Sequence, residues 1–534
     1  MKARILILMI FILPSTTILN SQTFVQSGPV FGDWFLSGSP YLIQGDIHLP
    51  SDQRLRIWPG VQVIFQGQYG FELQGKLDAT GTVSDSITFT FFDTTGYSQN
   101  NYSGWSGLLF NGMNYGFPDS SIMAYCNIEY SKFNGIICLY YPLLSIRDSE
   151  IRYNKASGLL LNDFSDIRIT STVIRDNNSD GLALNSSSPQ ISNFTVKNNK
   201  GSGISINGNG SGYLITSFIN GKISNNKSSS SGGGAYLNND AIAYFENITI
   251  ENNQAVDGGG IYCGMASCQM NNVVLIGNSS ANNGGAIFGS FFSVISIKSG
   301  LIAKNISGHQ GGGAFINNGT INLYNSTVSG NIAGISGSGL LFNTIFAPAS
   351  IVHNSIIYDN IGSEIEAFSV FPVISFSDIK GGFPGIGNID ADPLFTDPLN
   401  NNYNLSWTSF PEENTTKSPC IDSGDPDSTE DPDGTLSDMG AFYFDQGIYT
   451  SLNNISLDSD FEIYPNPAHD FVRVANVFGY NKLVLTNLSG TVLLTQDIDT
   501  GMNELNISDL NPGVYILQLT SNEMKKEVRK IIKK

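Results

Sequence analysis

An asparagine recurs through the middle of the chain at intervals of 22 to 29 residues, and an apolar residue precedes it each time by three positions. A glycine-rich run and a short apolar segment follow most of these asparagines, as in Gly233-Gly-Ala-Tyr. Units this short cannot bury a core alone and must stack on their neighbours. The nine repeated positions are Asn154, Asn177, Asn199, Asn226, Asn253, Asn278, Asn305, Asn331 and Asn360.

Each unit contains two or three strand-like runs rich in Ile, Val, Phe and Tyr, separated by Asn, Gly and Ser. No run shows the 3.6-residue period of an amphipathic helix. Leucine-rich repeats would need regular Leu positions, and propeller blades need units of about 40 residues. The pattern therefore predicts an all-β chain, built mainly as a right-handed parallel β-helix solenoid with three short strands per rung.

The asparagines have a physical role in such a fold. Parallel rungs stack about 4.8 Å apart, so a bend repeated at every rung aligns its asparagines into a ladder of side-chain amides. Asn and Gly also tolerate the left-handed backbone of a sharp bend. Residues 24–120 show less regular strands of the same kind, which predicts a cap followed by irregular first rungs.

The N-terminus is predicted to be a signal peptide. Lys2 and Arg4 precede the apolar run from Ile5 to Leu13, which is too short to span a bilayer. We expect cleavage between Ser21 and Gln22. No later stretch reaches 18 apolar residues, so we expect a soluble mature protein.

Composition restricts the partners. Acids outnumber bases 46 to 27, giving a net charge of −19. Nucleic acids and anionic lipids bind mainly through Lys and Arg, so they are poor partners for this chain. The five cysteines form no even set and predict no disulfide scaffold. Cys263 and Cys268 flank a short turn and could pair in an oxidising compartment.

The repeat resembles the pectin-lyase-like β-helix superfamily, and its Gly-Gly-Ala-Ile signature is similar to that of polymorphic outer-membrane proteins and related bacterial adhesins. The segment from Asp390 through Ser418-Pro-Cys to Asp438-Met-Gly is similar to the closing segment of many secreted β-helix proteins. This resemblance predicts the fold and leaves the function open, because lyases, hydrolases, adhesins and spacers share the solenoid.

The tail, residues 460–534, shows about seven alternating strands divided by turns, which predicts a small Ig-like β-sandwich. It resembles the C-terminal (type A) sorting domain of the type IX secretion system. The resemblance implies interaction with that machinery and translocation across the outer membrane, with the body shed or held at the surface. The residues that carry it are Tyr464, Pro465, Asn466, Pro467, Pro512, Gly513, Tyr515 and Lys530.

Together these features predict the domain organisation of the chain. The expected parts are a signal peptide (1–21), a cap with irregular rungs (22–120), regular rungs (121–385), a closing segment with an Asp-rich loop (386–447), a linker (448–459) and the sorting domain (460–534).

Catalytic motifs of the resembled enzymes are missing. Pectate-type lyases need a basic residue, usually Arg, yet no arginine occurs between Arg175 and Arg473. The hydrolase motifs are absent, and the nearest, Gly308-His309-Gln310-Gly311, lacks its partner acids. Inverting hydrolysis still needs only two carboxyls about 6.5–9.5 Å apart, which different rungs could supply.

We therefore favour a monomeric, secreted or surface protein that adheres to extracellular polysaccharide without catalysis. A polysaccharide lyase or glycoside hydrolase is the alternative. A cleft of convergent acids would favour the enzyme, and a flat Asn, Ser and aromatic face would favour binding.

Two clusters are candidate sites. Arg152, Arg175 and Lys197 each stand two residues before a repeated asparagine, so they should stack on consecutive rungs as a basic stripe. Stacked cations repel each other unless acids or a ligand compensate. Glu150, Asp148 and Asp176 could form a salt-bridge lattice with them; the alternative is a groove for an anionic glycan.

The second cluster is acidic. Asp431, Asp433 and Asp438 lie in a Pro- and Gly-broken loop whose spacing resembles that of calcium sites, where oxygen ligands alternate along the chain. The loop lacks the terminal Glu of an EF-hand, and the alternative is a solvated acidic loop. The scattered histidines do not indicate zinc.

Overall fold

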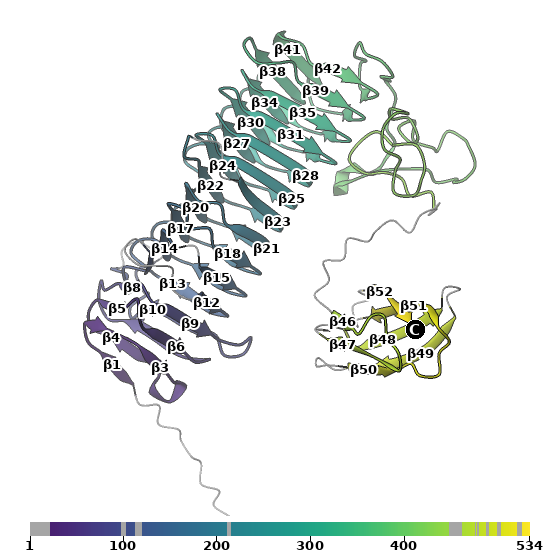
Figure 1. Ribbon diagram of the computed structural model, residues 1–534. Helices are drawn as coiled ribbons and strands as arrows, with labels where there is room; N and C mark the ends of the chain where they lie inside the picture. The colour runs from purple at the N-terminus through teal and green to yellow at the C-terminus, as the bar shows by residue number, and fades with distance from the viewer. Residues whose placement is uncertain are drawn as a thin grey trace, which may run out of the picture. The chain divides into compact units, whose positions relative to one another are not determined.

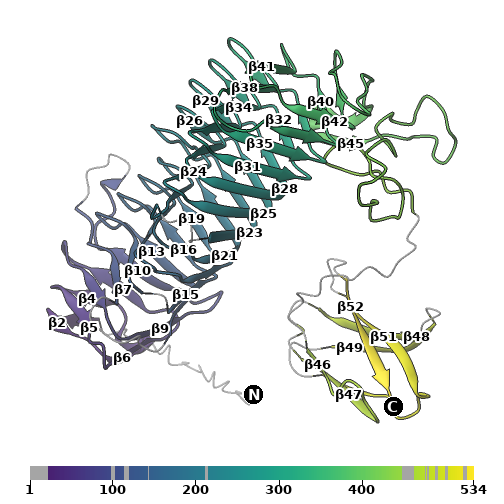
Figure 2. The same cartoon turned by 45° about the horizontal axis from the view of Figure 1, so that its top comes forward.

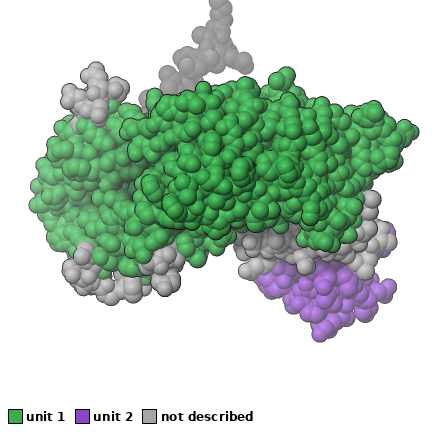
Figure 3. All heavy atoms as spheres, turned by 90° about the horizontal axis from the view of Figure 1, so that it is seen from above, with its two compact units in different colours: residues 1–448 green, residues 449–534 purple. Residues whose placement is uncertain are grey.

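The structure is a computed structural model. It describes residues 22–97, 103–112, 120–141, 143–210, 215–447, 462–475, 477, 480–487, 491–498, 503–520 and 526–534. The chain divides into two compact units, residues 1–448 and 449–534 (Figure 3). The predicted signal peptide, Ser21 and the predicted linker lie outside the described residues, so these predictions stay open.

The first unit is a parallel β-solenoid, as predicted, and successive rungs stack side by side (Figures 1 and 2). Within the described residues, one face is a sheet of 14 parallel strands. Its strands are β2 (Gly28–Pro29), β5 (Ile47–Leu49), β8 (Phe71–Leu73), β11 (Leu108–Asn111), β14 (Ile136–Leu139), β17 (Leu159–Asn162), β20 (Leu182–Asn185), β22 (Ile204–Asn207), β24 (Ala235–Asn238), β27 (Ile261–Gly264), β30 (Ile287–Ser290), β34 (Ala314–Asn317), β38 (Leu340–Thr344) and β41 (Ile365–Ser369).

The remaining sides of each rung come from a second, bent sheet, which counts 25 strands among the described residues. They are β1 (Thr23–Val25), β3 (Gly32–Trp34), β4 (Tyr41–Ile43), β6 (Arg54–Ile57), β7 (Gln62–Phe65), β9 (Lys76–Thr80), β10 (Ile87–Phe91), β12 (Ser121–Ala124), β13 (Cys126–Glu129), β15 (Leu144–Arg147), β16 (Glu150–Arg152), β18 (Arg168–Thr170), β19 (Val173–Arg175), β21 (Gln190–Lys197), β23 (Ile215–Ser224), β25 (Ile242–Glu251), β28 (Ser267–Ile276), β31 (Val294–Lys298), β32 (Leu301–Ala303), β35 (Thr320–Tyr324), β36 (Thr327–Ser329), β39 (Ile351–His353), β40 (Ile356–Tyr358), β42 (Val373–Ser375) and β43 (Asp378–Ile379). Four short strands form a further small sheet: β26 (Gln254–Ala255), β29 (Ser279–Ser280), β33 (Ile306–Ser307) and β37 (Ile332–Ala333).

The core is a set of apolar columns along the solenoid. Alternate residues of β25 point inward and are buried, and each inward residue pairs with its equivalent on the next rung, as Ile250 does with Leu275. Phe218 and Phe245 stack in the same way, with ring centroids 5.0 Å apart. Because every rung adds one layer to each column, the short repeat is stable only within the stack.

The nine repeated asparagines form the predicted ladder. Each of the first eight donates from Nδ2 to Oδ1 of the next asparagine over 2.8–3.0 Å, and that same Oδ1 accepts the backbone N–H of the earlier residue. At the end of the ladder Asn360 donates to Glu364 instead. The ladder therefore provides hydrogen-bond partners within the protein for the buried polar groups of this bend.

One part of the ladder prediction is wrong. The left-handed backbone lies on the residue before each asparagine, for example Tyr153 (φ 57°) and Asn252 (φ 55°). The ladder asparagine itself points inward and serves as a hydrogen-bonding core residue.

Rungs begin at the start of the described chain, since β1 pairs with β4 and β2 with β5. A 3₁₀ turn, η1 (Leu36–Gly38), interrupts the first of them. Nearby, Trp34 stacks on Tyr41 with ring centroids 4.5 Å apart. The described strands between residues 23 and 111 thus belong to the solenoid.

The closing segment, residues 386–447, pairs with the last rung only at its start, where Ile389 forms a parallel bridge with Asp378, and then leaves the rungs. It contains the antiparallel pair β44 (Phe395–Asp397) and β45 (Asn402–Leu405), joined through η3 (Pro398–Asn400). Its buried residues Trp407, Cys420 and Met439 pack around Ile356 on the outer side of the solenoid. The segment therefore covers the flank of the last rungs.

Over its described residues the second unit has seven antiparallel strands, in agreement with the number of about seven that the sequence predicted. A sheet of three, counted over the described residues, contains β46 (Glu462–Tyr464), β47 (Phe471–Ala475) and β50 (Asn503–Asn506). A sheet of four, counted in the same way, contains β49 (Val492–Asp497), β48 (Lys482–Asn487), β51 (Gly513–Thr520) and β52 (Lys526–Lys533). The fold class, a solenoid followed by a small sandwich, is confirmed.

Candidate functional site

The basic stripe lies in register, as predicted: Arg152 pairs with Arg175 across β16 and β19, and Arg175 pairs with Lys197. Arg152 donates to Glu129 over 2.8 Å and to Glu150 over 2.6 Å. Arg175 forms ion pairs with Glu150 and Asp176. The geometry favours the salt-bridge lattice, because carboxylates of the protein already form ion pairs with both guanidinium groups.

Tyrosine side chains also pack against the cations of the basic stripe. Arg175 donates to the Tyr153 hydroxyl over 2.8 Å, and its guanidinium lies 5.0 Å from the centroid of that ring. Tyr97 packs edge-on against Tyr130 and Tyr153. Hydrogen bonds to Glu150, Tyr153 and Asp176, which outweigh burial, raise the pKa of Arg175. The stripe is a packed structural element.

Two details of the lattice differ from the sequence prediction. Asp148 pairs with Arg147 over 3.0 Å and takes no part in it. Glu129, which the prediction omitted, is the partner of Arg152. The signal was available, because Glu129 occupies the position of Arg152 one rung earlier.

In the acidic loop, the side chains predicted to bind calcium accept hydrogen bonds from the loop itself. Asp438 accepts the backbone N–H groups of Asp422 and Phe444, and Asp431 accepts that of Asp438. Asp433 accepts from Thr435 and from the N–H of Gln446. Among the described residues, no three His, Cys, Asp or Glu side chains gather as metal ligands. These carboxylates bind backbone N–H groups of their own loop, so the described residues give the calcium prediction no support and it stays a prediction.

Burial of these acids changes their titration. It raises the pKa of Asp431 to about 6 and that of Asp438 to about 7. Burial acts on Asp433 too, but hydrogen bonds from Gln446 and Thr435 outweigh it and lower the pKa of this carboxyl.

A groove of about 1020 Å³ separates this loop from the solenoid. The solenoid contributes Tyr324, His353 and Lys298, and the closing segment contributes Glu430 and Asp431 among other residues. His353 Nε2 lies 3.5 Å from an oxygen of Asp425, and its Nδ1 lies 3.0 Å from the Ser375 hydroxyl. The groove brings acids together, but its most buried acid, Asp438, is fully engaged with backbone donors.

The predicted disulfide is absent. Cys263 and Cys268 are both free and buried, and the Cys263 thiol donates to the Ala266 carbonyl over 3.3 Å. The two residues lie on β27 and β28, which belong to different sheets, and both face the core. Burial raises the pKa of Cys263 to about 12, so the thiol stays protonated and unreactive.

A row of exposed apolar side chains follows the bend after the 14-stranded sheet. Sequence reasoning missed it, although the signal is a bulky residue where other rungs place Asn or Asp. We call it the apolar ridge. Its members, which are 50 to 74% exposed, are Met265, Phe291, Phe292, Ile345, Phe346 and Phe371.

Backbone hydrogen bonds keep the apolar ridge in register. The N–H of Met265 donates to the carbonyl of Ser290, and that of Phe291 donates to the carbonyl of Asn317. The N–H of Ile345 donates to the side chain of Asn318 over 2.9 Å. The rungs of Met265, Phe291 and Ile345 therefore present their side chains at one edge of the solenoid, with the rung of Asn318 between the last two.

Three members hold an unfavourable backbone. Met265 (φ 44°), Phe291 (φ 51°) and Phe292 (φ 62°) are left-handed, which costs a residue with a side chain about 1–2 kcal/mol. Asn239 and Asn318 are left-handed too. By strand register they occupy the equivalent bend on neighbouring rungs, so Asn would fit this conformation at a lower cost. Strain at exposed bulky side chains points to a function for them.

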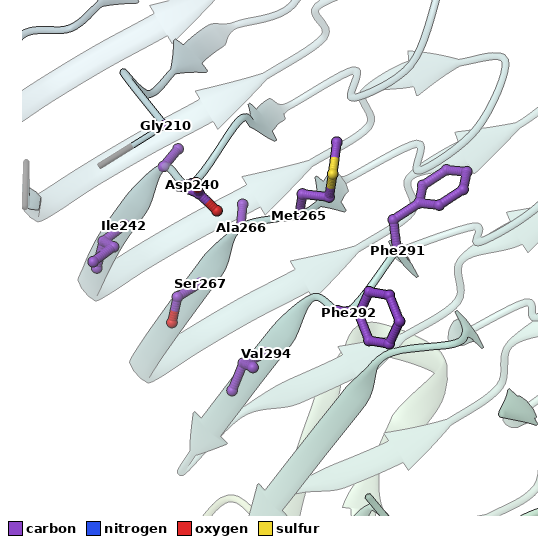
Figure 4. Close-up of a pocket in the computed structure, with 10 residues that line it drawn as sticks. Gly210, Asp240, Ile242, Met265, Ala266, Ser267, Phe291, Phe292 and Val294 are labelled. Atoms are coloured by element: carbon purple, nitrogen blue, oxygen red, sulfur yellow. The ribbon is translucent and has the colours of Figure 1, made fainter. Parts of the chain in front are cut away.

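Beside the apolar ridge lies a shallow hollow of about 590 Å³ (Figure 4). Ile242, Ser267 and Val294 line it from three successive strands, with Met265 and Phe292 at the bends. Asp240 is the one charged residue among the described lining residues. The hollow is therefore an apolar, almost uncharged surface.

An aromatic stack lies on the outward face of the 14-stranded sheet; Tyr236, Tyr262 and Phe288 are half-buried and Phe315 is buried. Tyr236, Tyr262, Phe288 and Phe315 follow one another on β24, β27, β30 and β34, with ring centroids 5.1, 5.6 and 5.3 Å apart. The Tyr262 hydroxyl lies 3.2 Å from that of Ser290, the residue before Phe291. The stack and the apolar ridge thus meet at the end of β30.

The predicted sorting residues hold the tail together. Asn466 donates from Nδ2 to the Lys530 carbonyl over 2.8 Å and accepts the N–H of Ile532 over 2.9 Å, which fixes β52. The Tyr515 hydroxyl donates to the Asn511 carbonyl over 2.7 Å, closing the turn that contains Pro512 and Gly513. Tyr464, Pro465 and Pro467 flank Asn466 at the end of β46.

Comparisons with known families agree with this description. Residues 462–534 match the family described as "Secretion system C-terminal sorting domain", and residues 83–219 match "Right handed beta helix region". The chain therefore contains a right-handed parallel β-helix region and a C-terminal sorting domain. That domain indicates type IX export, to the cell surface or beyond it. Among the described residues, no helix is long and apolar enough to cross a membrane.

Individual relatives are distant. A segment of 76 residues is 40% identical to Protein bark beetle of Drosophila melanogaster; it spans 14% of this chain and 2% of that protein. Pectate lyase Pel9A shares 15% identity at a TM-score of 0.31, covering 72% of this chain and 88% of the lyase. The periplasmic alginate epimerase AlgG shares 14% identity at a TM-score of 0.32, covering 62% and 77%.

Proposed function

We propose that this protein, exported through the type IX system, binds extracellular polysaccharide as a non-enzymatic, monomeric adhesion protein. The apolar ridge carries the proposal. Flat aromatic and apolar side chains that stay exposed at a cost in backbone strain mark an interaction surface. Sugar rings present C–H faces that pack on such side chains, while nearby hydroxyl and amide groups bind the sugar hydroxyls.

Hydrolysis in the groove is the second candidate. Asp431 supports it, because burial raises its pKa to about 6 and a general acid must keep its proton near the working pH. Against it, the carboxylates of Asp431 and Asp438 accept backbone N–H groups of their own loop. An Asp431→Asn variant would abolish reducing-end release if the groove were catalytic.

The test is retention of the solenoid, residues 22–447, on insoluble polysaccharides, with reducing ends measured in parallel. We expect retention without cleavage, and loss of retention in the double variant Met265→Asn/Phe291→Asn. Phe31→Asn is the matched control, since Phe31 is 57% exposed on the first rungs, outside the apolar ridge. Cleavage, or retention that the double variant leaves unchanged, would contradict the proposal.

Export has its own test. Deleting residues 460–534 removes the sorting domain and should leave the body in the periplasm, as measured by cell fractionation. Normal display of the truncated protein would show that another signal directs it.

A further inference from the structure

The apolar ridge is periodic, and its period restricts the ligand. Its members come from rungs that stack about 4.8 Å apart. Met265 and Phe291 lie on adjacent rungs, and Ile345 follows after the rung of Asn318. A ligand that contacts all of them must extend along the solenoid axis. The rung spacing is close to the advance of one pyranose ring in an extended β-linked chain.

The charges around the apolar ridge restrict the ligand further. No Lys or Arg occurs among the described residues that line the hollow, and Asp240 adds a negative charge. On the neighbouring strands, Lys222 is engaged with Glu251 over 2.8 Å. A polyanion such as a uronate polymer would meet no counter-charge on this surface and would be repelled by the acidic body.

Polar groups lie between the apolar contacts. Asn343 donates to Asn317 over 3.2 Å at the ends of β38 and β34, where both side chains are half-buried, and the half-buried Tyr262 hydroxyl accepts a hydrogen bond from the buried Ser290 side chain. Such amides and hydroxyls suit the equatorial hydroxyl groups of a neutral sugar, which need uncharged donors and acceptors on both sides.

Building on the proposed polysaccharide binding, we propose that the ligand is an uncharged, β-linked polysaccharide lying parallel to the solenoid axis, with one sugar ring per rung. The apolar ridge then forms the platform for the sugar rings, and the half-buried aromatic side chains Tyr236, Tyr262 and Phe288 lie beside it on the 14-stranded sheet.

The first experiment compares neutral with anionic polymers. Affinity electrophoresis of residues 22–447 would use xylan, mannan, cellulose derivatives and laminarin, with alginate and polygalacturonate as the anionic set. We expect retardation by at least one neutral β-linked polymer, nearly unchanged between low and moderate salt. Preference for an anionic polymer, weakened by salt, would overturn the ligand class while leaving polysaccharide binding intact. Retardation by no polymer would overturn the proposed function itself.

The second experiment measures length dependence. Oligosaccharides of two to six rings from the retained polymer would be titrated calorimetrically. We expect affinity to rise at least threefold per added ring up to four or more rings. In the variant Phe346→Asn/Phe371→Asn, which shortens the apolar ridge at one end, the rise should stop earlier, whereas Phe31→Asn should follow the wild type. Affinity that is independent of length would overturn the axial arrangement and leave polysaccharide binding in place.

Discussion

The basic stripe and the apolar ridge are both rows of similar side chains on stacked rungs. They differ in whether other residues of the fold form partners for those side chains. Both gather one kind of side chain along one edge of the solenoid over several rungs. In the basic stripe, Glu129, Glu150 and Asp176 compensate the cations within the fold. At the apolar ridge, Phe291 and Phe292 remain 60% and 63% exposed in a strained backbone. In a solenoid, the stacking of the rungs by itself aligns equivalent side chains in rows. A row whose side chains find no partner within the fold therefore points to a partner outside it.

The largest effect is expected from a substitution in the Asn ladder, which holds the rungs of both regions in register. Replacing Asn253 by Leu removes the acceptor of Asn226 and the donor to Asn278, leaving buried N–H groups unpaired. At about 1–3 kcal/mol per unpaired group, the loss should reach about 4 kcal/mol. Thermal unfolding of residues 22–447 measures it. An unchanged midpoint would mean that water replaces the ladder.

A smaller effect on stability is expected in the basic stripe, together with no effect on ligand binding. Arg175→Gln leaves Glu150 and Asp176 without their shared cation in a half-buried lattice, so we expect a loss of about 1–2 kcal/mol. Polysaccharide retention should not change. A stable variant that loses retention would reverse the roles of the two regions.

At the apolar ridge we expect the opposite result from a single substitution: binding should be lost while stability is kept. Phe291→Asn places a residue that tolerates φ 51° at the bend, so stability should stay constant or rise by up to about 1 kcal/mol while binding is lost. Phe291→Ala is the control, because alanine keeps the backbone penalty. A large loss of stability in the Asn variant would make the apolar ridge a structural element.

The smallest effect concerns pH at the C-terminal end of the ladder. Burial raises the pKa of Glu364 from 4.5 to about 7, although its bonds to Asn360 oppose this. Between these values the folded state binds more protons than the unfolded state, so stability should fall as pH rises. Solvent screening keeps the change below about 1 kcal/mol. Glu364→Gln should flatten this slope in unfolding measured from pH 4 to 8; an identical slope would place the titration elsewhere.

The sequence was sufficient to predict the features that follow from the repeat, but not those that depend on non-repeating segments. The spacing of the asparagines was enough for the solenoid, the ladder and the register of Arg152 with Arg175, because each follows from the repeat. The orientation of Asp431, Asp433 and Asp438 depends on a non-repeating loop that packs back on the solenoid, so their spacing suggested calcium where the structure shows hydrogen bonds to backbone N–H groups.

The apolar ridge shows a different limit. Its residues follow the strands of the 14-stranded sheet, where Phe and Ile could equally continue a buried strand. Only the rung geometry shows that Phe346 and Phe371 point outward. The disulfide prediction failed for the same reason: Cys263 and Cys268 are close in sequence, but each occupies an inward position on its own strand.

The Asn ladder also makes the length of this protein adjustable. Every ladder side chain donates toward the C-terminal end and accepts from the other side, from Asn154 to Asn331, so each rung offers its neighbours the same pair of groups. Gain or loss of one whole repeat would leave no broken bond at the junction. Duplication and deletion of repeats can therefore lengthen or shorten the exposed surface in unit steps, and relatives of different length can retain the same rung chemistry.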